Sequence, residues 1–308
     1  MPKPQRSHVD LISALLLLAL ATVWGGSFFF AEIALLEVPP LTVTLHRVFW
    51  AVPVLFCVVC WLGLTIPRSP KAWLCYFVMG ALNNAIPFSL IFWGQLTIES
   101  GLASILNGTT AVFGAIVASM FLQDEPLTMR KIIGAALGIA GVAAIMGFDA
   151  LANFDLRNLA QLAVLGAALS YAFASVWGRI YLAAYPPIMN AFGMLTASTL
   201  IMLPVVFWVD GTPHLALSLP VWAALLAVAI FSTAIAYLLY FSILKRAGAA
   251  NLMLVTILIP PIAVALSFTF LDEKLSGDAW IGFGLIASGL LVTTLQIRPA
   301  LSHRRGRL

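Results

Sequence analysis

The sequence predicts an all-α integral membrane protein with ten transmembrane helices, arranged as two inverted repeats of five helices. Three observations lead to this prediction. Hydrophobic residues make up 62% of the 308 residues and charged residues only 9%, whereas a soluble domain carries roughly 25% charge. The apolar residues fall into runs long enough to cross a bilayer, which takes about 20 residues. One acidic motif, with the glycine-bearing apolar run that follows it, occurs twice.

Apolar runs bounded by charged residues, proline or glycine define the helices in order. The expected spans are 11–35, 41–63, 72–96, 100–122, 130–148, 159–182, 188–208, 218–244, 248–271 and 278–297. Pro39-Pro40 and Pro186-Pro187 each open a helix, where the missing N–H of proline costs little. The expected organisation is a first five-helix repeat in residues 1–157, a second in residues 158–298 and a basic tail in residues 299–308.

The repeat is visible in LQDEPLTMRKIIGAALGIAGV (122–142) and FLDEKLSGDAWIGFGLIASGL (270–290). Asp124-Glu125 and Asp272-Glu273 lie 148 residues apart, and so do Gly134 and Gly282. A unit with an odd number of spans enters on one side of the membrane and leaves on the other, so its next copy is inserted upside down. The two acidic pairs are then expected on opposite faces, with helix N-capping and loop contacts as their role.

The distribution of basic residues predicts one orientation. With the N-terminus in the cytoplasm, thirteen of the sixteen Lys and Arg fall in inner segments, two (Arg157 and Lys274) in outer loops, and Arg47 within a span. This is the bias of the positive-inside rule, and it places both termini in the cytoplasm. It also accounts for the pI near 9.1, so no nucleic-acid partner is expected.

A family resemblance rests on several of these residues. They are Trp24-Gly25 in the first helix, Pro39-Pro40 followed by Arg47 in the second, Gly101-Leu102-Ala103 through Asn107 in the fourth, and the doubled acidic block. On these motifs, almost the whole chain resembles the drug/metabolite transporter superfamily, specifically its EamA-type ten-helix exporters. The resemblance implies a basket of ten helices around a central cavity, lined by helices 1, 3, 4, 6, 8 and 9 and buttressed by helices 5 and 10. The even spread of aromatic residues is most similar to bacterial exporters of amino acids, including aromatic ones.

Polar groups inside a membrane are costly and therefore candidates for function. Asn83 and Asn84 lie near the middle of the third helix. Adjacent side chains point about 100° apart on a helix, so at least one amide is expected to face the interior. It would hydrogen-bond the carboxylate or ammonium of a zwitterion, or else link two helices. The sequence leaves open which asparagine faces the cavity.

Aromatic and hydroxyl side chains form a second group of candidates for the substrate-binding surface. Trp24 and Ser27 share a face of the first helix, Tyr171 is the repeat partner of Trp24, Ser175 follows it by one turn, and Tyr237 lies in the eighth helix. Aromatic belts sit at the membrane interface, whereas Trp24 and Tyr171 are expected near the midplane. A hydroxyl group at that depth needs a partner or a cavity.

The fourth and ninth helices supply a third group, in which Asn107 and Thr110 share a face and Thr256 precedes Pro260 and Pro261. A proline inside a helix frees a carbonyl group and bends the axis. Pro260 and Pro261 are therefore candidate hinges for alternating access, with Pro87 in the third helix as a second site. The alternative is a static kink that only shapes the basket.

Arg47 and the glycines have mainly structural expectations. Arg47 is near the level of Glu32 in the first helix, which favours an Arg47–Glu32 pair or a side chain that snorkels to the outer interface. The functional alternative is that Arg47 attracts a substrate carboxylate. Gly134 and Gly138 in helix 5, and Gly284 and Ser288 in helix 10, are expected to allow close packing inside the basket.

The prediction is an exporter of amino acids, including aromatic ones, or similar small metabolites, working by alternating access. A small-molecule substrate and membrane lipid are its expected partners, and a monomer or weak homo-oligomer its state. Cys57-x-x-Cys60 has no further His or Cys beside it, so no metal or cofactor is expected. No carboxylate sits mid-span and no P-loop occurs, which argues against a buried proton carrier and ATP drive. With His46 the only histidine in a span, an enzyme is not expected. The alternative is a multidrug or cationic-compound exporter of the same superfamily, which would hold a flat cation through cation–π contacts.

Overall fold

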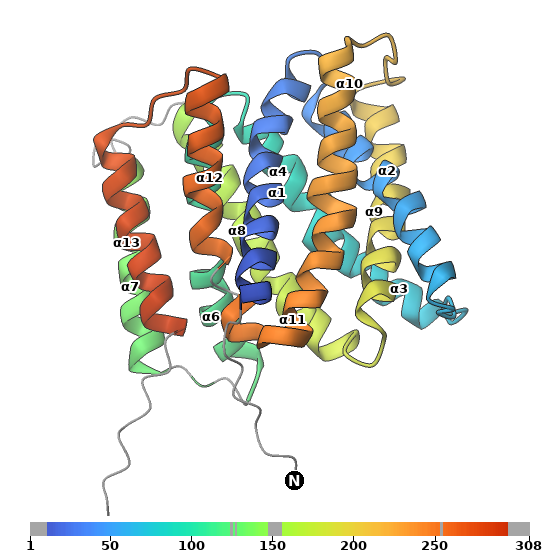
Figure 1. The fold of residues 1–308 in the computed structure, drawn as a ribbon, viewed down its shortest axis with the longest axis horizontal. Helices are drawn as coiled ribbons and strands as arrows, with labels where there is room; N and C mark the ends of the chain where they lie inside the picture. Colours follow the sequence, from blue (N-terminus) through green and yellow to red (C-terminus); the bar gives the residue numbers. More distant parts are fainter. Residues whose placement is uncertain (1–10, 124–125, 127, 147–155, 253–254, 295–308) are drawn as a thin grey trace, which may run out of the picture.

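The computed structural model describes residues 11–123, 126, 128–146, 156–252 and 255–294, and every regular element among them is a helix. The helices stand side by side in a bundle (Figure 1). The first half contains α1 (Leu11–Leu35), α2 (Pro40–Trp61), α3 (Pro70–Gly80), the π-helix η1 (Ala81–Ala85), α4 (Ile86–Gly94), α5 (Ser100–Asn107), α6 (Thr110–Phe121) and α7 (Met129–Met146). The second half contains α8 (Leu156–Tyr181), α9 (Pro187–Val209), α10 (Leu219–Leu226), the π-helix η3 (Ala227–Ile235), α11 (Ala236–Leu252), α12 (Val255–Phe270) and α13 (Gly277–Thr294).

Seven helical stretches in the described residues are long and apolar enough to cross a membrane. They are Leu11–Leu35, Pro40–Trp61, Pro70–Gly94, Ser100–Phe121, Arg157–Tyr181, Pro187–Val209 and Leu219–Ala247. Pro40 and Pro187 begin α2 and α9, so the predicted role of both proline pairs is confirmed. A backbone surrounded by lipid must satisfy its own hydrogen bonds, and a helix does this within one segment.

Three expected spans depart from plain α-helix. The third contains η1, the eighth contains η3, and the fourth is interrupted between α5 and α6 at Gly108 and Thr109. The predicted break between residues 244 and 248 is wrong, because α11 continues to Leu252. Lys245 and Arg246 suggested a helix end, but long basic side chains near a membrane surface reach water without ending the helix.

Carboxylates at one end of the bundle hold the starts of several helices. Glu273 accepts hydrogen bonds from the backbone N–H groups of Ser100 (3.0 Å) and Gly101 (3.3 Å) at the start of α5. Asp210 likewise accepts from the Thr42 N–H (3.1 Å) and hydroxyl (2.7 Å) in the first turn of α2. The predicted capping role of the second acidic pair is thus confirmed for Glu273. Asp124 and Glu125, the first pair, lie outside the described residues, as does the tail 299–308.

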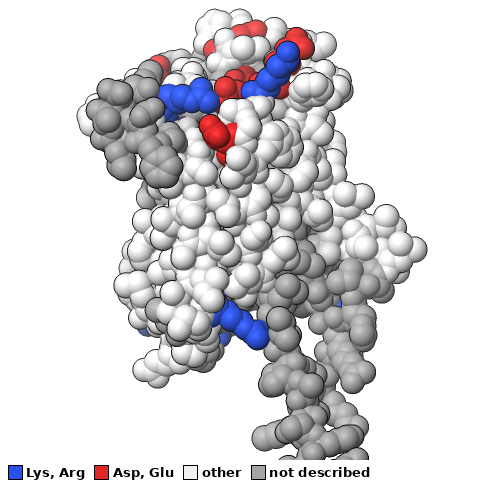
Figure 2. Space-filling model, turned by 90° about the vertical axis from the view of Figure 1, so that its left-hand side faces the viewer, with Lys and Arg blue, Asp and Glu red and all other residues white. Residues whose placement is uncertain are grey.

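Charged side chains are confined to the two ends of the bundle in the view of Figure 2, with an uncharged band between them. Acidic and basic residues mix at the upper end, and only basic residues show at the lower end. The Glu99–Arg157 ion pair (3.0 Å) joins the residue before α5 to the beginning of α8. An uncharged band of this kind fits the hydrocarbon core of a bilayer, in which charged side chains are costly.

Helices α7 and α13 pack against each other at one side of the bundle (Figure 1). A Cβ atom added at Gly141 would lie 2.7 Å from the carbonyl oxygen of Gly282, and one at Gly289 would lie 2.5 Å from that of Gly134. The contacts run in opposite order along the two helices, so α7 and α13 are antiparallel. Backbones approach this closely only where both helices present small residues.

The predicted glycine faces are therefore half correct. Gly134 of α7 contacts α13 through its carbonyl oxygen, whereas a Cβ atom at Gly138 would lie 2.8 Å from the Val112 side chain of α6. On α13 the contact is made by Gly282 and Gly289, whereas Gly284 has open space beside it and Ser288 is exposed. On α13, the Gly282–Gly289 face and the Gly284–Ser288 face both carry small residues at helical spacing. The sequence therefore does not distinguish them, and the position of α7 decides which face is in contact.

A comparison of two alanine substitutions on α13 tests this packing. Gly282→Ala would place a Cβ atom 2.7 Å from the Gly141 carbonyl and against the Ile145 side chain. We expect it to lower the free energy of unfolding by about 1–3 kcal/mol, as overpacking does. The matched control Gly284→Ala should be neutral or slightly stabilising, because alanine favours the helix and nothing obstructs it. Equal thermal unfolding temperatures for the two variants in detergent would contradict the assigned face.

Candidate functional site

Buried and half-buried polar and aromatic side chains gather around the two π-helices. We call this group the polar centre; its members are Arg47 (α2), Asn83 and Asn84 (η1), Tyr171 (α8), Ser198 (α9), Thr233 (η3) and Tyr237 (α11). They come from segments more than 100 residues apart in the chain and form two hydrogen-bonded groups, one around Asn83 and Asn84 and one that joins Arg47 to Thr233. π-Helical turns are rare and frequently occur at functional sites.

The two asparagines play different parts in the polar centre. Asn84 is fully buried, and its amide donates to the Ser198 hydroxyl (3.0 Å). Asn83 is half-buried, and its amide donates to the Tyr237 hydroxyl (3.0 Å), which itself donates to Asn84 Oδ1 (3.4 Å). Asn84 therefore ties η1 to α9, while Asn83 holds the more accessible position.

Arg47 belongs to the same cluster, and its predicted pairing with Glu32 is wrong. The Arg47 side chain is 8% exposed, its Nε donates to Thr233 Oγ1 (3.0 Å), and its Nη2 is 3.5 Å from the Ser232 carbonyl oxygen. Glu32 instead accepts a hydrogen bond from Gln95 Nε2 (3.1 Å). Depth along the chain placed the two residues at a similar level, but the rotation of α2 turns Arg47 toward η3.

Aromatic rings surround the guanidinium group. The Arg47 Cζ atom lies 3.7 Å from the centroid of the Phe88 ring, a cation–π contact. Phe88 meets Tyr171 edge to face at 6.5 Å between centroids. Tyr171 thus reaches the surroundings of Arg47 through the Phe88 ring. The predicted interior position of Tyr171 therefore agrees with the contacts.

A run of ring contacts leads from the polar centre to α1. Tyr237 stacks on Phe241 (6.2 Å), Phe241 meets Tyr240 (5.1 Å), and Tyr240 meets Trp24 (6.0 Å). Ser27, which follows Trp24 on α1, is buried. By contrast, Ser175 is exposed and its hydroxyl donates back to the Ala172 carbonyl (2.7 Å), so no hydrogen bond joins it to the polar centre.

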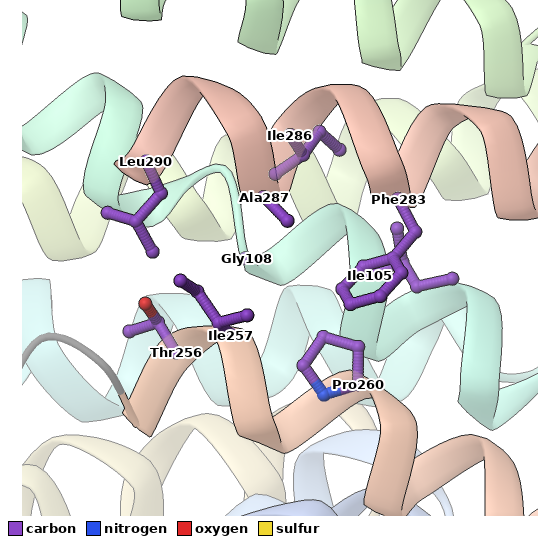
Figure 3. Close-up of a pocket in the computed structure, with 9 residues that line it drawn as sticks. All are labelled: Ile105, Gly108, Thr256, Ile257, Pro260, Phe283, Ile286, Ala287 and Leu290. Atoms are coloured by element: carbon purple, nitrogen blue, oxygen red, sulfur yellow. The ribbon is translucent and has the colours of Figure 1, made fainter. Parts of the chain in front are cut away.

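The remaining predicted residues lie at the break in the fourth span and along α12. Thr256 and Pro260 line a small hollow between the break, α12 and α13, shown in Figure 3 with Ile105, Gly108, Ile257, Phe283, Ile286, Ala287 and Leu290. Its cavity volume is about 10 Å³, roughly the space of one water molecule. Nearby, the Thr110 hydroxyl donates to the Asn107 carbonyl (2.7 Å). None of the residues that line this hollow belongs to the polar centre.

The predicted hinge prolines have different settings. Pro87 is buried in the first turn of α4, directly after η1, where it adjoins the polar centre. Pro260 is buried and Pro261 exposed in α12, which continues through both from Val255 to Phe270. A proline next to a π-helix leaves backbone groups that neighbouring side chains can satisfy.

Sequence reasoning missed Ser198, Phe88 and the pair Ser232-Thr233. One signal was available, since Ser232 stands 148 residues after Asn84, the same offset as the doubled acidic block. Both π-helices contain one of these two polar residues. Within the described part of the chain, no three His, Cys, Asp or Glu side chains gather as metal ligands.

Comparisons with known proteins match the sequence of this chain to a family. A model described as the EamA-like transporter family matches residues 11–147 and 158–295. The uncharacterized transporter YvbV of Bacillus subtilis is 27% identical over 92% of each chain. A probable amino-acid metabolite efflux pump of Escherichia coli is 26% identical over 95% of this chain and 97% of its own. A probable terminal-alkyne amino-acid exporter of Streptantibioticus cattleyicolor is 27% identical over 79% of each.

The fold also resembles a solved structure. A protein known from a crystal structure superposes with a TM-score of 0.65 at 20% sequence identity, covering 92% of this chain and 96% of its own. At that identity the likeness concerns the fold alone.

Separate alanine substitutions of Asn83 and Asn84 test whether Asn84 contributes more to stability than Asn83. Asn84→Ala removes the fully buried amide that donates to the Ser198 hydroxyl, and we expect a loss of about 1–3 kcal/mol in the free energy of unfolding. Asn83→Ala breaks a half-buried hydrogen bond to Tyr237 and should cost only about 0.5–1.5 kcal/mol. Thermal unfolding of both variants in one detergent gives the comparison. A larger loss for Asn83→Ala than for Asn84→Ala would reverse the assignment.

Proposed function

The chain belongs to the EamA-like transporter family, and from this premise we propose that it exports amino acids, including aromatic ones, or similar small metabolites by alternating access. The membrane would be a bacterial inner membrane. The observation that carries the proposal is the polar centre, in which amides, hydroxyls, a guanidinium and aromatic rings meet deep among apolar helices. Polar groups at such a depth mark substrate pathways in membrane proteins.

The chemistry of the polar centre suits a small zwitterion with an apolar or aromatic side chain. Asn83 donates to Tyr237, and both residues donate to Asn84 Oδ1, so these two residues can exchange internal hydrogen bonds for bonds to a substrate at little net cost. The rings of Tyr240 and Trp24 continue the same surface and offer an apolar face for a side chain. Two of the relatives carry amino-acid metabolite efflux or amino-acid export in their names, which supports the same substrate class.

We also propose that the chain crosses the membrane ten times as two inverted repeats, with the central cavity at the polar centre. The packing of α7 on α13 supports this. Gly134 meets Gly289 and Gly141 meets Gly282, and under the 148-residue offset each of these pairs converts into the other. A contact that maps onto itself when two units are exchanged is the mark of a two-fold axis.

Further pairs of elements obey the same exchange. The π-helices η1 and η3 lie in the third and eighth expected spans, which correspond between repeats. Likewise α1 packs on α12, and α8 packs on α5 and α6. Binding sites of inverted-repeat transporters lie near the midplane, where non-standard helical segments from the two halves meet. The polar centre likewise contains residues from both π-helices, Asn83 and Asn84 from η1 and Thr233 from η3.

Counterflow into liposomes tests the substrate class. Vesicles that contain the purified protein are preloaded with one unlabelled amino acid at a time, and labelled phenylalanine, methionine or threonine is supplied outside without an ion gradient. We expect accumulation by the wild type, and a reduction of up to about tenfold in Asn83→Ala, the size expected for one hydrogen bond. Ser288→Ala, on the exposed face of α13, is the control. Movement of a cationic dye with no amino-acid accumulation would overturn the proposal and favour a cation exporter.

Cysteine labelling tests the inverted topology. Ser69 in the α2–α3 connection and Thr212 in the α9–α10 connection are both exposed and lie in corresponding loops of the two halves. In a chain whose native Cys57, Cys60 and Cys75 are replaced by alanine, we expect an impermeant maleimide to label Thr212→Cys from outside intact cells. Ser69→Cys should react only after the cells are opened. Labelling of both residues from the same side would exclude inverted repeats.

A further inference from the structure

The guanidinium group of Arg47 is a buried cation whose hydrogen bonds within the described residues all go to neutral acceptors. Nε donates to the Thr233 hydroxyl, and Nη2 makes a long contact of 3.5 Å with the Ser232 carbonyl. The nearest candidate for an ion pair by depth, Glu32, is bonded to Gln95 instead. A buried charge is strongly disfavoured unless it is paired or well hydrogen-bonded. Arg47 is therefore electrostatically complementary to an anion.

One edge of the guanidinium group has unused hydrogen-bonding capacity. The Phe88 ring covers one face at 3.7 Å, and Thr233 engages Nε on the side edge. Nη1 makes no hydrogen bond to any described residue, and the Nη2 contact of 3.5 Å is at the limit of a hydrogen bond. The Nη1–Nη2 edge carries two parallel donors, the arrangement that a carboxylate accepts in a bidentate manner.

We infer that Arg47 binds the carboxylate of the transported molecule through its Nη1–Nη2 edge. This inference rests on the proposed export function and narrows its substrate to molecules that carry a carboxylate. Thr233 and Phe88 fix the guanidinium orientation in advance, which lowers the entropy cost of binding. A cationic compound without an anionic group is excluded from the same position by charge repulsion.

The opposite end of an amino acid finds a complementary group nearby. The Oδ1 atom of Asn83 accepts no hydrogen bond from the described residues, while its amide nitrogen bonds to Tyr237, four residues after the Arg47 partner Thr233 on the same helical stretch. An amide oxygen is an acceptor suited to an ammonium group. The carboxylate provides the main attraction, because Arg47 carries a full opposite charge whereas Asn83 is neutral.

A series of three ligands on the wild-type protein tests the inference without any substitution. Phenylalanine carries both charged groups, 3-phenylpropionate only the carboxylate, and 2-phenylethylamine only the ammonium. Ligands that bind the native state raise the thermal unfolding temperature in detergent. We expect phenylalanine and 3-phenylpropionate to bind, and 2-phenylethylamine to bind at least about tenfold more weakly. Equal affinity for 3-phenylpropionate and 2-phenylethylamine would overturn the inference. Absence of binding by both phenylalanine and 3-phenylpropionate would also overturn it.

Matched substitutions locate the effect at Arg47. Arg47→Gln should weaken binding of 3-phenylpropionate by at least about tenfold, whereas Arg68→Gln, the same change at an exposed residue, should leave it unaltered. Arg47→Lys keeps the charge but lacks the two-donor edge. Its affinity for 3-phenylpropionate should therefore lie between that of Arg47→Gln and that of the wild type. If Arg47→Gln does not fold, Arg47→Lys and the wild-type ligand series still test whether Arg47 binds the carboxylate. Unchanged affinity in Arg47→Gln contradicts the inference.

The outcomes separate this inference from the proposed function. Arg47-dependent binding of 3-phenylpropionate, with no counterflow of any amino acid, would remove amino acids as substrates and retain the carboxylate site. Counterflow of phenylalanine with the same KM in Arg47→Gln and wild type would retain the amino-acid exporter and remove Arg47 as its anchor.

Discussion

A polar group that is buried away from water must find its partner inside the protein, and the architecture depends on this constraint. The apolar helices satisfy their backbones within themselves, so only side chains and irregular turns introduce unsatisfied groups. Both occur together where Arg47 donates to Thr233 in η3 and Asn84 in η1 donates to Ser198 in α9. These two hydrogen bonds join segments from different halves of the chain. The cost of burying these groups is offset only if the halves meet in this register.

The bundle combines a tightly packed side with an adaptable centre. On the packed side, glycine backbones of α7 and α13 approach too closely for a Cβ atom, so the two helices have little freedom to slide. In the centre, Asn83, Asn84 and Tyr237 hold one another with bonds between 3.0 and 3.4 Å. Rearranging hydrogen bonds among neutral groups costs about 1 kcal/mol each, which is small enough for exchange with bonds to the proposed substrate. Both π-helices adjoin these residues.

One end of the bundle is held by carboxylates placed at helix starts. Glu273 bonds to the start of α5, Asp210 to the first turn of α2, and Glu37 to the backbone N–H of Ser218 before α10 (2.9 Å). The hydrogen bonds from Ser218 lower the pKa of the exposed Glu37 carboxyl group. Anions at helix N-termini are favoured by the unsatisfied N–H groups and the helix dipole. Hydrogen bonds of this kind contribute little where water competes for the same groups.

The sequence by itself determined the helical class, the approximate position of most helices and the list from which the polar centre is drawn, because a bilayer makes hydropathy a direct record of which segments it covers. Asn83, Asn84, Tyr171 and Tyr237 were predicted and meet in the polar centre, whereas Thr256 and Pro260 line a separate hollow. Tertiary structure alone decided the rotation and partner of each helix. Tertiary contacts orient Arg47 toward Thr233 instead of Glu32, and they place Gly282 instead of Gly284 against α7. They also accompany the π-helical segments within the third and eighth spans. Hydropathy is one-dimensional, and every face of a lipid-embedded helix is apolar, so only contacts between distant segments can distinguish one face from another.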